Sequence, residues 1–434
     1  MKKTILFTCL TALLAACSGK SAVTAPEETT VQPVNLILDT DLGPDYDDVG
    51  AMALMHALAD SGQVNILAAV SSNKDEHVVP CIEVLNTYFN RPDIPVGAPK
   101  SEGGVSLTTW HKTKWTEELP ARYPHKTAKT SDASDAVKVY RRILSTQPDS
   151  SVVVCTIGFF TNLKDLLLSG GDEYSPLSGC DLVAKKVKRV VSMAGLFPEG
   201  KEFNVYCDTP ASRVVAERWP TEIIFSGFEI GNMIFTGKKL VQMDVEDSPV
   251  KDAYSLCFAE GDPNGRMSWD LTAVLVAVKG YEPYYNVERG TFRVVNDEGA
   301  NSWTPDGKGK DLRLIEKVPA VEMAVLIENY MMKKDDVDAY KNYLTEGLTS
   351  ENIVKKIYYD NLGNEVPVFL VTGERFESEY QGRLYVRSMH EAVNQDGTIN
   401  INVLGEVVSE VFRKYMSHET ISENALALMK EAIK

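Results

Sequence analysis

The chain lacks a surplus of positive charge. Its 434 residues include 45 Lys and Arg but 61 Asp and Glu, which gives a net charge of −16. Because a negatively charged surface is repelled by phosphate groups, this balance disfavours binding to nucleic acid or to an anionic membrane surface. The sequence therefore predicts a small or neutral partner and no nucleic acid.

Cysteine is scarce, and no two cysteines form a CxxC pair. Seven occur in the whole chain, and those in the part expected to fold are Cys81, Cys155, Cys180, Cys207 and Cys257. Their wide and irregular spacing argues against a zinc site. Five cysteines cannot all pair, so we expect most of them to be buried as small hydrophobic side chains. The sequence leaves disulfide pairing open.

The first apolar run, Ile5 to Leu14, is too short to span a membrane stably. Two lysines precede it and small residues follow it, which is typical of a secretory signal peptide. The sequence LAAC that ends at Cys17 resembles the lipobox of bacterial lipoproteins, in which the cysteine becomes a lipidated N-terminus. This resemblance predicts an exported protein that a lipid on Cys17 anchors to the bacterial envelope. Ser18 favours the outer membrane, and the membrane face stays open.

Four segments are expected along the chain. Residues 1–17 form the signal peptide, and the polar, Pro/Thr-rich residues 18–33 form a flexible tether. In residues 34–334, strand-like runs such as VNLILDT alternate with helical patterns, which predicts an α/β fold: an open, mostly parallel sheet flanked by helices. Residues 335–434 mix helical pieces with the strand-like VPVFLVTGE and predict a small C-terminal α+β appendage of unknown role.

Five aspartates follow the first expected strand within ten residues: Asp39, Asp41, Asp45, Asp47 and Asp48. Helix capping explains one or two of them. Carboxylates crowded at the end of a buried strand are costly unless a cation neutralises them, and ligands that are all oxygen favour Ca²⁺ or Mg²⁺ over zinc. The cluster therefore predicts a site for a hard metal ion, with an acidic turn as the alternative.

Two other metal motifs fit this stretch less well. An EF-hand loop needs Glu at its twelfth position, where this chain has Gly50 or Met52, depending on the aspartate from which the count begins. A haloacid-dehalogenase phosphatase expects Thr or Val two residues after its second Asp, where this chain has Gly43.

The motif DTDLGPDYDD resembles that of the inosine/uridine-preferring nucleoside hydrolase family, whose first strand ends in Asp-x-Asp-x-Gly before a further Asp-Asp pair. The spacing is two residues longer than in the best-known members, so the inner role falls to Asp45 or Asp47, and we favour Asp47. Further landmarks of the family follow in order at Asn73, Thr156, Met193, the Glu202-Phe203-Asn204 segment and Asp270. The resemblance covers residues 34–334, with the C-terminal extension beyond it.

The resemblance implies a metal-dependent hydrolase that cleaves the N-glycosidic bond of a ribonucleoside and releases ribose and a free base. It implies Ca²⁺ as the cofactor and Asp41 as the general base. The implied metal ligands are Asp41, Asp47, Asp48, the backbone carbonyl of Thr156, and Asp270. The implied substrate-binding residues are Asp47, Asn73, Met193, Glu202, Phe203, Asn204 and Trp269.

The chain departs from the family at Trp269, where the best-studied members carry a His that helps the base to leave. Tryptophan has no titratable proton to donate. Activation of the leaving group must then come from stacking on an aromatic ring such as Trp269, from another residue such as His111, or from a substrate that needs no acid. A surface role is the plainer interpretation of His111.

Two alternatives to nucleoside hydrolysis therefore stay open. The first is hydrolysis of another ribosyl or glycosyl substrate at the same calcium site. The second is a non-catalytic lipoprotein that binds a nucleoside or sugar in a calcium-dependent way. The loop between Gly195 and Lys201 also lacks an additional ribose-binding Asn of the family. The sequence does not fix the base preference, and it leaves a homo-oligomer open.

Overall fold

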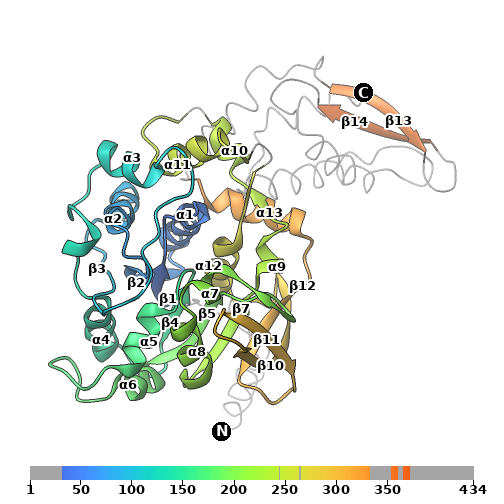
Figure 1. The fold of residues 1–434 in the computed structure, drawn as a ribbon. Helices are drawn as coiled ribbons and strands as arrows, with labels where there is room; N and C mark the ends of the chain where they lie inside the picture. Colours follow the sequence, from blue (N-terminus) through green and yellow to red (C-terminus); the bar gives the residue numbers. More distant parts are fainter. Residues whose placement is uncertain (1–31, 244, 263–264, 333–352, 360–364, 372–434) are drawn as a thin grey trace, which may run out of the picture. The chain divides into compact units, whose positions relative to one another are not determined.

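The computed structural model describes residues 32–332 except 244 and 263–264, together with two strands at 353–359 and 365–371 (Figure 1). These two strands, β13 (Ile353–Tyr359) and β14 (Glu365–Val371), pair antiparallel. The predicted signal peptide, and nearly all of the predicted tether, lie outside the described residues. So does most of the predicted appendage at 335–434.

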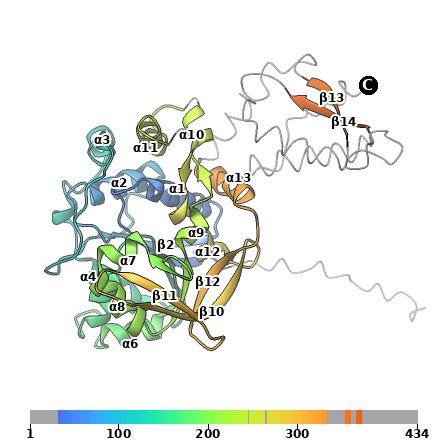
Figure 2. The same cartoon turned by 45° about the vertical axis from the view of Figure 1, so that its right-hand side comes forward.

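A ten-stranded sheet forms the centre of residues 33–332, in the order β3-β2-β1-β4-β5-β7-β12-β10-β11-β6. The strands from β3 to β12 in this order pair in parallel. The last three pairings, β12-β10, β10-β11 and β11-β6, are antiparallel. This antiparallel part of the sheet lies beside α8 in Figure 2. The strands are β1 (Val34–Thr40), β2 (Val64–Ser71), β3 (Val96–Gly97), β4 (Val152–Thr156), β5 (Val187–Met193), β6 (Glu199–Lys201), β7 (Glu222–Ser226), β10 (Tyr285–Val294), β11 (Ala300–Pro305) and β12 (Asp311–Glu316).

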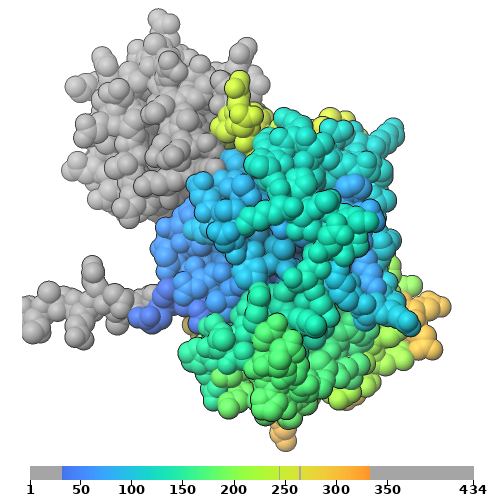
Figure 3. Space-filling view, turned by 90° about the vertical axis from the view of Figure 1, so that its left-hand side faces the viewer, coloured from blue at the N-terminus to red at the C-terminus, as the bar shows by residue number. Residues whose placement is uncertain are grey.

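Helices cover both faces of this sheet, because successive side chains of a strand point to opposite faces. In β1, Leu36 and Leu38 enter one hydrophobic cluster, whereas Ile37 enters the other. The first cluster includes side chains of α1 (Asp47–Asp60), α2 (Val78–Tyr88), α3 (Trp115–Arg122), α11 (Pro249–Phe258), α12 (Trp269–Lys279) and α13 (Ala320–Tyr330). The second includes side chains of α4 (Ala136–Thr146), α5 (Thr161–Leu168), α6 (Gly179–Lys186) and α8 (Thr209–Arg218). Figure 3 views the side covered by α2 to α6. The predicted α/β fold with an open, mostly parallel sheet is confirmed.

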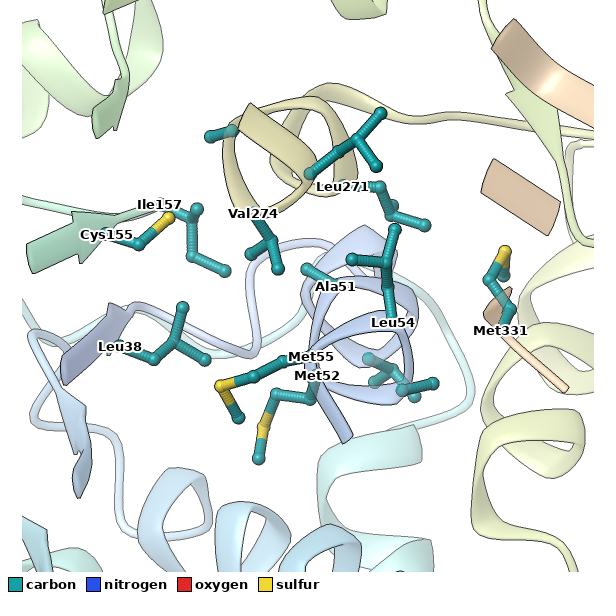
Figure 4. Packing of buried hydrophobic residues seen from close by; sticks show 14 of the residues in the cluster. Leu38, Ala51, Met52, Leu54, Met55, Cys155, Ile157, Leu271, Val274 and Met331 are labelled. Carbon is teal, nitrogen blue, oxygen red and sulfur yellow. The ribbon is translucent and has the colours of Figure 1, made fainter. Parts of the chain in front are cut away.

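Helices α1 and α12 lie at the centre of the first cluster and pack against each other. Figure 4 shows Met52 and Met55 of α1 close to Leu38 of β1, with Val274 of α12 close to Ile157. Because both helices are apolar on almost every side, they are buried nearly completely. This packing fixes the relative position of their N-termini.

Short elements complete this part of the chain: α7 (Phe203–Cys207), α9 (Phe228–Gly231), α10 (Lys238–Gln242), β8 (Phe235–Thr236), β9 (Arg266–Met267) and the 3₁₀ turn Thr130–Asp132. The five cysteines here are free, and Cys81, Cys155 and Cys257 are buried. In the part of the chain that the structure describes, no helix combines the length and the apolar character needed to cross a bilayer.

Candidate active site

Three buried carboxylates meet where two helices begin. Asp47 and Asp48 lie in the first turn of α1, and Asp270 lies in the first turn of α12. One oxygen of each carboxylate lies within 4.8 Å of the others. The backbone N–H of Asp270 donates to Oδ2 of Asp47 at 3.1 Å, which joins the two helix starts directly. Negative charge is favoured at a helix N-terminus, so both helices stabilise this carboxylate cluster.

The cluster is costly to ionise. Burial, followed by the charge of Asp48, raises the pKa of Asp47 to about 8, and burial raises the pKa of Asp48 to about 6. Burial and the neighbouring carboxylates raise the pKa of Asp270 well above its ordinary value. A cation would remove the mutual repulsion and keep these groups ionised near neutral pH. The donor atoms are all oxygen, so the residues fit Ca²⁺ or Mg²⁺.

Asp41 lies beside the cluster, just after β1. It is buried, and its pKa is raised by burial first and then by the charges of Asp48, Asp47 and Glu202. Gly158 packs directly against it: a Cβ at that position would lie 2.4 Å from the backbone nitrogen of Asp41. Only glycine therefore fits at 158 with Asp41 in this place.

The structure separates the two aspartates between which the sequence leaves a choice. Asp47 belongs to the cluster. Asp45 instead forms an ion pair with Arg266 and accepts a hydrogen bond from the backbone N–H of Tyr46 at 2.8 Å. The geometry thus favours Asp47 for the inner role, and its predicted function as a ligand stays a prediction.

Thr156 ends β4 and pairs in register with Asp39 of β1. The next residue, Ile157, donates its backbone N–H to the carbonyl of Asp39 at 2.8 Å. These bonds place the end of β4 beside the segment that leads to Asp41. The use of the Thr156 carbonyl as a metal ligand stays a prediction.

Asn73 follows β2 and uses its whole side-chain amide within the protein. Its Nδ2 donates to the carbonyls of Asp41 and Leu107 at 3.0 and 2.7 Å. Its Oδ1 accepts from the backbone N–H groups of Asp75 and Leu107 at 3.1 and 3.0 Å. Asn73 therefore holds the backbone of Asp41 in place, and its predicted contact with a ribose hydroxyl stays a prediction.

On one side of the cluster lie Met193, Glu202, Phe203 and Asn204, here called the α7 flank. Glu202 caps α7: its carboxylate accepts the backbone N–H groups of Asn204, Gly195 and Val205 at 2.8, 3.0 and 3.2 Å. Burial raises the pKa of Glu202 to about 7. Asn204 donates to the carbonyl of Met193 at 3.1 Å. These hydrogen bonds fix the side chains of Glu202 and Asn204 near the end of β5.

Two aromatic rings pack against Phe203 of this flank. Phe203 contacts Trp110 edge-on, with 5.6 Å between ring centroids, and packs against Tyr206 at 5.4 Å. Trp110 is 55% exposed, so the loop after β3 places a ring at the surface beside Phe203.

A different group, Tyr46, Arg266 and Trp269, is here called the Arg266 flank. Tyr46 precedes Asp47 and Trp269 precedes Asp270. The guanidinium carbon of Arg266 lies 5.1 Å from the ring centroid of each, so the cation lies against both rings. Sequence reasoning missed Arg266 and Tyr46. Tyr46 lies within DTDLGPDYDD, but the motif gives it no role, and its contact with Arg266 joins distant segments.

Trp269 is fixed by its indole N–H, which donates to the carbonyl of Phe228 at 2.8 Å. The Phe228 ring lies 5.2 Å from that of Trp269. A Cβ on Gly231 would lie 2.3 Å from the Cα of Trp269, so glycine at 231 allows α9 to approach the start of α12. The predicted stacking of a substrate on Trp269 stays a prediction.

The ring of His111 contacts that of Tyr46, with 5.3 Å between ring centroids and an edge-on geometry. Burial is the main cause of its lowered pKa, so the imidazole is neutral at pH 7. Its Nδ1 lies 3.2 Å from the hydroxyl of Thr109. A neutral histidine in this position is a weak proton donor.

Comparison with known proteins gives one matching family. A family model described as inosine-uridine preferring nucleoside hydrolase matches residues 36–322. No protein with a curated description matches the chain.

Solved structures share the fold at low sequence identity. A plant nucleoside hydrolase, PpNRh1, is 19% identical with a TM-score of 0.52, over 69% of this chain and 99% of that one. A purine-preferring ribonucleoside hydrolase from Gardnerella vaginalis is 16% identical with a TM-score of 0.53, over 68% and 98%. An inosine-uridine preferring nucleoside hydrolase from Bacillus anthracis is 16% identical with a TM-score of 0.52, over 69% and 99%.

Proposed function

The chain belongs to the inosine-uridine preferring nucleoside hydrolase family, and from this premise we propose that it hydrolyses the N-glycosidic bond of ribonucleosides to give ribose and a free base. One observation carries the proposal: Asp47, Asp48 and Asp270 meet within 4.8 Å at two helix N-termini, and Asp41 lies beside them. Such a group can hold a hard cation and accept a proton from water within one site.

We propose Ca²⁺ as the cofactor. The residues that would hold it are Asp41, Asp47, Asp48, Asp270 and the carbonyl of Thr156. When bound, a divalent cation would lower the pKa of a water molecule in the site.

Asp41 is proposed as the general base. Burial and three neighbouring carboxylates raise its pKa, and a higher pKa makes a carboxylate a stronger proton acceptor. The hydrogen bond from Asn73 to the carbonyl of Asp41 and the close packing of Gly158 hold Asp41 in a single position. Precise placement matters because a proton acceptor must lie within hydrogen-bond reach of the water.

The α7 flank is proposed to bind the sugar, together with Asp47 and Asn73. As the bond to the base stretches, positive charge develops on the ribose ring, and a nearby carboxylate stabilises that charge. Glu202 is suited to this role because three backbone N–H groups hold its carboxylate in place. Met193 and Phe203 supply apolar contacts on the same side.

One feature favours a second candidate within the same chemistry. Trp269 supplies no titratable proton, which favours a leaving group that departs without being protonated first. Hydrolysis of another ribosyl or glycosyl compound at the same calcium site is therefore the second candidate. The N-terminal sequence supports the further proposal that the enzyme acts outside the cytoplasm, anchored by a lipid on Cys17.

The test is to incubate the purified protein with a panel of ribonucleosides, with Ca²⁺ or with EDTA, and to measure the release of free base and of reducing sugar. We expect release that EDTA abolishes and Ca²⁺ restores. Turnover of other ribosides but of no nucleoside would support the second candidate. Tight binding without turnover of any substrate would contradict the proposal and support a calcium-dependent binding protein.

A further inference from the structure

Thr40 is the last residue of β1 and stands between Asp39 and Asp41 in the sequence. Its side chain is completely buried, and its hydroxyl donates a hydrogen bond to Oδ1 of Asp48 in the first turn of α1. Asp48 is one of the three carboxylates of the cluster. A hydroxyl at the end of the first strand is therefore hydrogen-bonded to one member of the cluster.

The direction of this hydrogen bond follows from the groups around the hydroxyl. The backbone N–H of Leu42 donates to Oγ1 of Thr40 at 3.1 Å, so that contact uses a lone pair and leaves the single hydrogen of the hydroxyl available. An ionised carboxylate can only accept, and the hydrogen therefore points to Asp48. With Asp48 ionised, the contact is a charge-assisted hydrogen bond, which is stronger than one between neutral groups.

The backbone of Thr40 is held by the segment that follows β2. The carbonyl of Thr40 accepts the backbone N–H of Ser72 at 2.8 Å. The hydroxyl of Ser72 in turn accepts the backbone N–H of Phe159 at 3.0 Å, which ties the segment after β4 to the same place. Three neighbouring strand ends thus set the position from which the Thr40 hydroxyl donates.

The preceding residue, Asp39, is engaged on the other face of the sheet. Its carboxylate accepts hydrogen bonds from the hydroxyl of Tyr140 at 2.8 Å and from Nδ2 of Asn162 at 3.1 Å. Tyr140 belongs to the second hydrophobic cluster. Because successive side chains of a strand point to opposite faces, Thr40 lies on the face that α1 covers. Thr40, and not Asp39, is therefore the residue of β1 that contacts the carboxylate cluster.

A carboxylate that binds a metal ion must be ionised and must keep its orientation. A hydrogen bond from a neighbouring side chain serves both needs, because the donor stabilises the charged form and fixes the oxygen that accepts it. Asp47 receives such a bond from the backbone N–H of Asp270, which no substitution other than proline removes. Asp48 receives its bond from the side chain of Thr40, so this support can be removed by changing one residue.

We propose that Thr40 is a positioning residue of the metal site: its hydroxyl holds the ionised carboxylate of Asp48 in the orientation that binds Ca²⁺. The inference rests on the proposed calcium-dependent function. Thr40 acts through Asp48, so loss of its hydroxyl weakens metal binding first and turnover only as a consequence. A sufficiently high concentration of Ca²⁺ should then restore most of the turnover, which it would not do if Thr40 acted on the substrate.

The test is isothermal titration calorimetry of Ca²⁺ into the purified protein after EDTA treatment and dialysis. Thr40→Val keeps the shape of the side chain but removes the hydroxyl, and we expect its Kd for Ca²⁺ to rise by about 10- to 100-fold. Thr40→Ala should show a similar rise, and it replaces the valine variant if that one does not fold. Thr40→Ser keeps the hydroxyl, so its Kd should stay within about threefold of wild type.

Turnover of inosine at two Ca²⁺ concentrations gives a second measurement. Near the wild-type Kd for Ca²⁺, Thr40→Val should lose activity in proportion to the unfilled sites. Well above the Kd of the variant, its kcat should return to within about tenfold of wild type. A loss of kcat that stays the same at both concentrations, with Kd unchanged, would overturn the inference.

Thr130→Val is the matched control. Thr130 is also buried, and its hydroxyl also accepts a backbone N–H, that of Val79 at 3.0 Å, but this contact joins α2 to the 3₁₀ turn. The variant should therefore keep the wild-type Kd for Ca²⁺. A rise in Kd as large as that of Thr40→Val, in either Thr130→Val or Thr40→Ser, would overturn the inference.

The outcomes also separate this inference from the proposed function. If the wild type binds Ca²⁺ but cleaves no nucleoside or other riboside, the proposed hydrolysis fails, and the Kd values of the Thr40 variants still decide the role of Thr40. If the wild type hydrolyses nucleosides and the Thr40 variants bind Ca²⁺ as tightly as it does, the function stands and the inference fails. If the wild type binds no Ca²⁺, the proposed cofactor and the inference fail together.

Discussion

The two flanks of the carboxylate cluster are built in different ways. On the α7 flank, Glu202 bonds to backbone N–H groups of Asn204 and Val205, its near neighbours in sequence. On the Arg266 flank, the guanidinium is held by contacts with Asp45 and Tyr46, which lie far earlier in the chain. A local structure of the first kind can be carried by a short sequence motif, whereas the second exists only once the chain has folded. A sequence motif can therefore reveal the α7 flank, whereas the Arg266 flank becomes visible only in the structure.

The largest effect is expected at Asp41, beside the carboxylate cluster. Asp41→Asn removes the proposed proton acceptor and should lower kcat by about 10³- to 10⁴-fold for every substrate, because water activation does not depend on the leaving group. The measurement is kcat for inosine, uridine and 4-nitrophenyl riboside, with circular dichroism to check the fold. Asp60→Asn is the control: Asp60 lies at the far end of α1, where it pairs with Arg91, and its loss should be at least a hundredfold smaller. Comparable losses in the two variants would contradict the role of Asp41.

The next effect belongs to the α7 flank. Glu202→Gln removes a negative charge but keeps the shape, and it should lower kcat/KM by about 10²-fold through weaker stabilisation of the charged sugar. The loss should be the same for phenyl and 4-nitrophenyl β-D-ribofuranoside, because the positive charge on the sugar ring develops with either aglycone. The weakened cap of α7 should also cost about 1 kcal/mol of unfolding free energy, measured in urea. A loss that depends on the aglycone would remove the distinction between the flanks.

A smaller effect should follow from Gly231→Ala on the Arg266 flank. The new Cβ would lie 2.3 Å from the Cα of Trp269, which belongs to the backbone and cannot rotate away. We expect about 1 to 3 kcal/mol less unfolding free energy and a loss of activity that is greater for the poorer leaving group. The control is Gly170→Ala, since nothing lies within 4 Å of a Cβ there. Wild-type stability and wild-type substrate ratios in Gly231→Ala would show that this approach of α9 does not matter.

The smallest expected effect concerns the cluster between the flanks. Folding raises the pKa of Asp48 to about 6 and that of Asp47 to about 8, so the folded chain binds protons more tightly than the unfolded chain. These groups therefore stabilise the metal-free fold fully at low pH, and this contribution is lost as the pH rises from about 4 to 8.

Differential scanning fluorimetry in EDTA should accordingly show Tm falling by roughly 5 °C between pH 5 and pH 8. Added Ca²⁺ should raise Tm more at pH 8 than at pH 5, because it binds the ionised carboxylates. A metal-free Tm that rises over this range, or a Ca²⁺ effect that is larger at pH 5, would contradict the proposed state of the cluster.

Much of the fold could be predicted from sequence because its signals are local. The alternation of apolar strands with helical patterns predicted the parallel sheet, and the dense aspartates after VNLIL predicted a polar site at the end of β1. Asp270 could be placed near that site only through the family resemblance, since nothing local distinguishes it from a helix cap.

Arg266 and Tyr46 could not be predicted. An arginine three residues before a helix usually faces solvent, and only the packing of α12 against α1 brings Arg266 to Tyr46 and Asp45. Asn73 shows the converse case. Its position after β2 was predictable, but two of the four hydrogen bonds that occupy its amide are with Leu107, in the loop that follows β3.

The division of the cluster between α1 and α12 also bears on how the protein matures. A growing chain carries Asp47 and Asp48 long before Asp270 has been synthesised, and the third carboxylate reaches the others only when α12 packs against α1. A nascent or truncated chain that ends before α12 would therefore hold two of the three carboxylates and no complete cluster. Metal loading would then be a late event that reports completion of the fold, in whichever compartment folding takes place.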